Sequence, residues 1–121
     1  MRIELNATAE GMEAIVDFTW RQVVALWDNE RPEAANFIAD ICGLAMQQAR
    51  AQAAGIPGAG TIDFTTTNLE GRAEVLALAG KLCAEATARG NAAAADLFRR
   101  IESTLRAEAE SRHELEKLYS L

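Results

Sequence analysis

Glu110 and His113 are the residues whose types and spacing come nearest to a metal site. They stand three positions apart in a stretch with helical periodicity, so both side chains lie on one face of the expected helix. Carboxylate and imidazole groups are common ligands of divalent transition metals. Because His113 is the single histidine of the chain, a complete site needs ligands from elsewhere.

The Glu110-x-x-His113 element resembles that of ferritin-like and rubrerythrin-like proteins, which hold two metal ions inside a four-helix bundle. Those proteins use a second Glu-x-x-His and two further glutamates, and this chain has no second histidine. The acids on other expected helices fit a solvated face better, namely Glu10, Glu13, Asp17, Asp40 and Glu74. We therefore expect no metal and no cofactor. The alternative is a ferritin-like bundle whose site is completed across a dimer.

No set of residues predicts catalysis. The spacing of Arg106 and His113 is similar to that in the HEPN helical ribonucleases, but the surrounding residues are as acidic as they are basic. The segment GIPGAG, residues 55–60, lacks the Lys-Ser/Thr of a phosphate-binding loop. We therefore expect that the protein is not an enzyme and assign no catalytic residues.

The net charge indicates which kinds of partner are disfavoured, and the cysteines indicate the cellular compartment. The net charge is −6 and the pI is about 4.8, which disfavours nucleic acid and anionic membranes as partners. No apolar run approaches the roughly 20 residues that a membrane span needs. Cys42 and Cys83 lie within apolar stripes, which predicts buried, reduced thiols. With no recognisable signal peptide, these features predict a cytoplasmic protein.

Hydrophobic periodicity predicts a mainly α fold of four helices in two hairpins. The helices are expected over residues 8–29, 32–54, 67–90 and 92–120. Pro32 separates the first two, Gly55 and Gly90 are placed to end helices in the left-handed conformation, and Asn91 can cap the last helix. A capping box from Thr67 to Glu70 opens the third helix.

Two short segments, residues 1–5 and 61–66, alternate between apolar and polar residues as strands do. We expect them to pair with each other or with their copies in a second chain, because a lone strand cannot satisfy its backbone groups. The whole chain, 1–121, is expected to form one domain. A linker at 55–60 joins two halves, 1–55 and 61–120. The pattern of each half predicts a strand, a helix, a turn and a second helix. Chance similarity of Ala-rich hairpins is the favoured explanation, and an internal repeat is the alternative.

The apolar stripe of the first helix is wider than one neighbouring helix can cover. An interaction face is predicted at Phe18, Trp20, Val24 and Trp27. Two tryptophans in a small domain more often fill its core, yet the surplus apolar surface favours a partner. We therefore predict a small interaction or assembly module that forms a homodimer or binds another protein. The alternative is a ligand-binding protein with a tryptophan-lined pocket between the hairpins.

Overall fold

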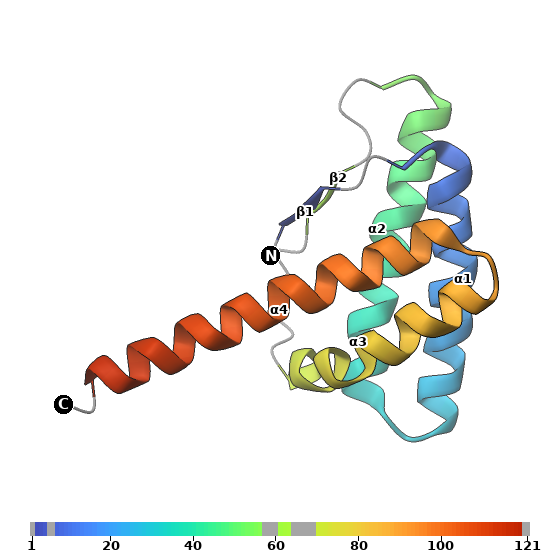
Figure 1. Ribbon diagram of the computed structural model, residues 1–121. Coiled ribbons are helices and arrows are strands. Elements are labelled where there is room, and N and C mark those ends of the chain that lie inside the picture. The colour runs from blue at the N-terminus through green and yellow to red at the C-terminus, as the bar shows by residue number, and fades with distance from the viewer. Residues whose placement is uncertain (1, 5–6, 57–60, 64–69, 120–121) are drawn as a thin grey trace.

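The computed structural model describes residues 2–4, 7–56, 61–63 and 70–119. Within these residues four helices dominate: α1 (Ala9–Asp28), α2 (Pro32–Ala53), α3 (Glu70–Ala88) and α4 (Ala92–Tyr119). The prediction of a mainly α, four-helix domain is therefore confirmed. Helices α1 and α2 form one antiparallel hairpin, and α3 and α4 form a second that crosses the first at a steep angle (Figure 1).

Strands β1 (Arg2–Glu4) and β2 (Thr61–Asp63) form a two-stranded antiparallel sheet beside α2 (Figure 1). The register places Ile3 opposite Ile62, with Arg2 opposite Asp63. Pairing of the two predicted segments is thus confirmed over these residues. The remaining parts of the predicted strands, residues 57–60 of the linker and Thr67 of the predicted capping box lie outside the described residues.

Helix ends follow local sequence signals. Thr8 caps α1, because its Oγ1 accepts a hydrogen bond from the Gly11 amide at 3.1 Å. Pro32 occupies the first position of α2, where its missing N–H costs nothing. Gly55 ends α2 with a φ of 71°, and the Ile56 amide bonds to the Ala51 carbonyl at 3.0 Å. These boundaries agree with the predicted ones to within about one residue.

The turns within the two hairpins use the same hydrogen bonds sixty residues apart. In the first, the Arg31 amide donates to the Leu26 carbonyl at 2.9 Å, and in the second the Asn91 amide donates to the Ala86 carbonyl at 2.8 Å. The residue before each donor has a positive φ, 58° at Glu30 and 72° at Gly90. Both are αL helix ends of the Schellman type. The end of α2 at Gly55 has the same geometry, so this match is not specific to a repeated unit, and the internal repeat stays a prediction.

Glu30 is the one non-glycine residue in the described chain with a positive φ, and its counterpart in the second turn is glycine. We expect Glu30→Gly to raise the free energy of unfolding by roughly 0.5–1 kcal/mol, because relief of left-handed strain exceeds the added entropy of the unfolded chain. Gly90→Glu should lower it by about 1 kcal/mol. Chemical denaturation of both variants measures this pair of opposite shifts. Equal signs would show that the two turns are not equivalent.

The hydrophobic core lies between the hairpins and takes residues from all four helices. Phe18 of α1 and Phe98 of α4 meet edge to face, with ring centroids 5.6 Å apart. Phe37, Ile38 and Ile101 are buried around the same core. The interior members are Met12, Ile15, Phe18, Val23, Leu26, Ala34, Ala35, Phe37, Ile38, Ile41, Ala45, Ala49, Val75, Leu82, Ala86, Ala94, Leu97, Phe98, Ile101 and Leu105.

Candidate functional site

Glu110 and His113 lie on the C-terminal half of α4, which projects beyond the other helices (Figure 1). Both residues are exposed to solvent. No cluster of three or more His, Cys, Asp or Glu residues suited to a metal ion occurs in the part of the chain that the structure describes. Four of the five acids expected on a solvated face are exposed, and Glu74, which is half-buried beside Arg31, is the exception. Within one chain, therefore, Glu110 and His113 are not joined by further ligands from other described residues.

The α1 apolar face consists of Trp20, Val24 and Trp27. These positions follow the spacing of four and three residues that places side chains on one side of a helix. Trp20 is 60%, Val24 45% and Trp27 51% exposed. Such exposure is unusual for two tryptophans in a small domain, where large aromatic side chains are mostly buried. This face is the first candidate site.

Phe18 does not belong to the α1 apolar face, and its prediction as an interaction residue is wrong. Only 2% of Phe18 is exposed, because its ring packs against Phe98 of the second hairpin. The general tendency of tryptophans to fill the core of a small domain does not hold here, because Trp20 and Trp27 are both more than half exposed. The core side of α1 is occupied by residues such as Met12 and Ile15, and the side of α1 that carries the tryptophans is left in solvent.

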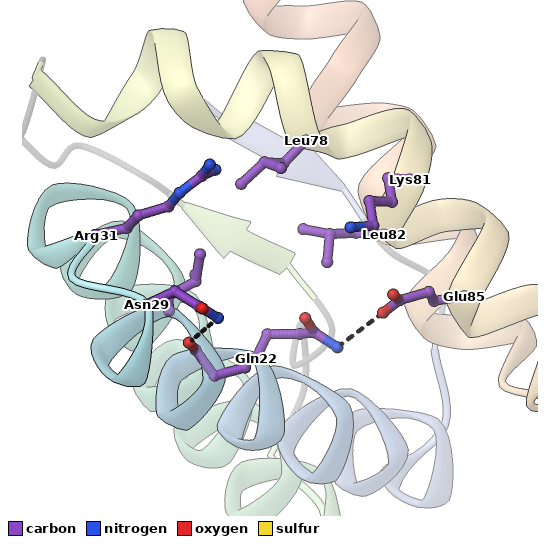
Figure 2. A pocket seen from close by; sticks show the side chains of 9 residues that line it. Gln22, Asn29, Arg31, Leu78, Lys81, Leu82 and Glu85 are labelled. Carbon is purple, nitrogen blue, oxygen red and sulfur yellow. Dashed lines mark hydrogen bonds between the residues drawn. The ribbon is translucent and has the colours of Figure 1, made fainter.

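A pocket of about 450 Å³ between the two hairpins is the second candidate site. It lies between the C-terminal half of α1, the turn that follows it, and α3 (Figure 2). Its lining residues are Gln22, Ala25, Leu26, Asn29, Arg31, Leu78, Lys81, Leu82 and Glu85. The sequence predicted a pocket between the hairpins lined by tryptophans, but Trp20 and Trp27 are not among these residues.

Polar contacts organise the rim of this pocket. The Gln22 amide Nε2 donates to Glu85 Oε2 at 3.3 Å, which joins α1 to α3 (Figure 2). The Asn29 side-chain amide donates to the Ala25 carbonyl at 2.8 Å. Arg31 Nε lies 3.4 Å from Glu74 Oε1, a second link from the turn to α3. Lys81 has no hydrogen-bond or ion-pair partner among the described residues.

The cysteines differ in burial. Cys42 is 5% exposed and its Sγ lies 3.7 Å from the Val16 carbonyl oxygen, as expected for a core thiol. Cys83 is only half-buried, with its Sγ 3.4 Å from the Ala95 carbonyl oxygen, so the prediction that both are core residues is wrong for Cys83. Both are free thiols. They come from different hairpins and show no paired geometry that would indicate redox chemistry.

A charged cluster on α4 is an ion-pair network within one helix. Asp96 accepts a hydrogen bond from Arg100 Nε at 2.8 Å and another from Arg99. Partial burial acts to raise the pKa of Asp96, but the hydrogen bonds and positive charges of Arg100 and Arg99 outweigh it, so the pKa lies below its ordinary value. Its arginine partners already satisfy this carboxylate, so the cluster is a structural feature of α4.

No protein-family model, curated protein or solved structure matches this chain. The class that the fold defines is a mainly α domain of two crossed helical hairpins with a small two-stranded sheet. None of the helices within the described ranges combines the length and the apolar character that a membrane crossing requires.

Sequence reasoning missed the residues of the pocket. Gln22 and Arg31 appear in the sequence as polar residues beside an apolar stripe, and Lys81 and Glu85 as an ordinary pair on the next hairpin. The sequence held one weak indication of these residues, which is that Lys81 and Glu85 are spaced to lie on the same side of a helix. Only the crossing of the hairpins brings Gln22 close enough to bind Glu85 instead.

Proposed function

We propose that the protein is a small helical interaction module that forms a homodimer through the α1 apolar face. The observation that carries this proposal is the exposure of Trp20, Val24 and Trp27 along one side of a single helix. Tryptophan is enriched at the energetic centres of protein interfaces. An exposed apolar patch bordered by polar residues is typical of an interaction surface. No catalytic activity is part of this proposal.

A second copy of the chain is the occupant that the spacing favours. Trp20 and Trp27 lie at the two ends of the face, with Val24 between them. Two antiparallel α1 helices related by a two-fold axis would therefore place Trp20 of one copy opposite Trp27 of the other. The exposed pair Asp17 and Arg21, 3.4 Å apart, borders this face and would form part of a polar rim.

The exposed area is consistent with the centre of an interface. Since a tryptophan can bury about 150–250 Å², the exposed parts of these three residues offer on the order of 300 Å² per copy. A stable interface buries roughly 800 Å² per partner, so neighbouring polar residues must supply the remainder. The tryptophans would act as the apolar anchors and the rest as complementary surface.

The double variant Trp20→Glu/Trp27→Glu tests this proposal. We expect the wild type to sediment at micromolar concentration with twice the monomer mass of 13.1 kDa. The variant should dissociate at least about 100-fold more readily, because two anchors are lost and four charges are buried together in the dimer. Sedimentation equilibrium measures the mass of the wild type and the dissociation constant of the variant.

Gln47→Glu/Ala84→Glu serves as the matched control, since it adds the same two charges at exposed positions on α2 and α3. It should leave the dimer intact. A wild type that sediments only at 13.1 kDa would refute the homodimer. Equal weakening by the control would show that total charge, and not the α1 apolar face, governs association.

A cytoplasmic location and the absence of nucleic acid partners complete the proposal. The free thiols of Cys42 and Cys83 suit a reducing compartment. The net charge of −6 opposes binding to polyphosphate chains.

A further inference from the structure

We propose that the pocket between the hairpins binds a small organic monocarboxylate with a short apolar tail. This site is separate from the α1 apolar face, because the α1 residues that line the pocket, such as Gln22 and Leu26, lie on the opposite side of the helix from that face. Its volume of about 450 Å³ lies within the range of small-molecule sites.

Aliphatic side chains from both hairpins provide an apolar surface for the tail. Ala25 and Leu26 come from α1, and Leu78 and Leu82 come from α3. Figure 2 shows Leu78 and Leu82 directed into the space between α3 and the first hairpin. Contact with these side chains removes apolar ligand surface from water, which favours a ligand with several methylene groups over a purely ionic one.

Two cations provide the anchor for the head group. Lys81 has no hydrogen-bond or ion-pair partner in the described part of the chain, although Glu85 is spaced to pair with it; Glu85 Oε2 accepts from Gln22. Arg31 uses its Nε toward Glu74, and its terminal nitrogens have no hydrogen bond to any described residue. Lys81 and Arg31 both line the pocket, and in Figure 2 Arg31 extends from the α1–α2 turn toward Leu78 while Lys81, on α3, lies beside Leu82. A carboxylate can accept from both.

The carboxylates beside the pocket restrict the charge of the ligand. Glu85 lines the pocket, Glu74 pairs with the lining residue Arg31, and the whole chain carries a net charge of −6. A doubly charged phosphate ester would be repelled by these acids more strongly than a carboxylate with one charge. The arrangement therefore fits a monoanion, held by Lys81 and Arg31 with its tail on Leu78 and Leu82.

Hexanoate is a suitable probe, with hexan-1-ol as the uncharged analogue and acetate as the analogue without a tail. In an NMR titration we expect hexanoate to shift the methyl signals of Leu78 and Leu82 saturably, with a Kd of about 1 mM for a ligand of this size. Hexan-1-ol and acetate should each bind about tenfold or more weakly, since each lacks one of the two contacts.

Lys81→Gln removes the anchor charge at an exposed helix position and should weaken hexanoate binding about tenfold. Arg89→Gln, exposed and outside the pocket, changes the net charge equally and should leave the Kd unchanged. Lys81→Arg should retain binding. The proposal is overturned if hexanoate gives no saturable shift, if hexan-1-ol binds as tightly, or if Lys81→Gln and Arg89→Gln have equal effects.

The monomeric or dimeric state of the protein does not affect this test. Trp20→Glu/Trp27→Glu should bind hexanoate as the wild type does, because neither tryptophan lines the pocket. Failure of the dimer and failure of the pocket are therefore distinguishable.

Discussion

Phe98→Ala should lower the free energy of unfolding by about 3–5 kcal/mol. Phe98 is fully buried on α4 and packs edge to face against Phe18 of α1, so its ring joins the two hairpins. Truncation removes this apolar contact and leaves a cavity that the surrounding helices cannot close completely. Because small domains are stable by only about 5–15 kcal/mol, the loss should be evident in chemical denaturation.

Two further variants separate hairpin packing from a general effect on α4. Ser103→Ala, at an exposed position of the same helix, should change stability by less than about 0.5 kcal/mol. Phe98→Leu retains most of the side-chain volume and should cost about 1–1.5 kcal/mol, which keeps the test valid if the alanine variant does not fold. In a double-mutant cycle, Phe18→Ala and Phe98→Ala should show a coupling of about 0.5–1.5 kcal/mol. A loss below about 1 kcal/mol for Phe98→Ala would contradict the crossed-hairpin core.

Asn91→Ala should be the most damaging change among the turn residues, with a loss of about 2–3 kcal/mol. The Asn91 side chain acts at two places. Its Oδ1 accepts from the Ala94 amide at 3.1 Å and so caps α4, while its Nδ2 donates to the Ala14 carbonyl of α1 at 3.0 Å. Alanine removes the cap and the link between the hairpins together.

Thr8→Ala is the matched control, because Thr8 caps α1 through the Gly11 amide and its side chain makes no other hydrogen bond to a described residue. It should cost about 1 kcal/mol. Asn91→Ser, which keeps a capping oxygen but is too short to reach Ala14, should fall between the wild type and Asn91→Ala. Equal losses for Thr8→Ala and Asn91→Ala in chemical denaturation would show that the bond to Ala14 does not stabilise the fold.

The helix boundaries were predictable because the signals that set them act over a few residues. Pro32 cannot continue a preceding helix, Gly55 and Gly90 adopt the left-handed conformation without strain, and Asn91 caps through its own side chain. None of these effects depends on distant parts of the chain. The pairing of the two strand segments could also be predicted from the sequence, because the backbone groups of residues 2–4 and 61–63 require hydrogen-bond partners.

The tertiary structure decided which residues of the apolar stripe of α1 are buried and which stay exposed. Helical periodicity placed Phe18, Trp20 and Trp27 in one wide apolar stripe. The angle at which a second hairpin crosses this stripe cannot be predicted from the periodicity. The observed crossing buries Phe18 against Phe98 and leaves both tryptophans exposed.

The same crossing created the pocket. By sequence alone, Lys81 and Glu85 are an i, i+4 pair on one helix and Gln22 is a polar residue on another. Bringing α1 beside α3 places Gln22 within hydrogen-bond distance of Glu85, and Lys81 makes no ion pair with Glu85. The sequence alone determined the helices, their ends and the acidic charge, because these follow from local conformation and composition. The exposed tryptophans and the pocket depended on the tertiary structure, because they arise from contacts between residues far apart in the sequence, such as Phe18 with Phe98 and Gln22 with Glu85, where no local preference acts.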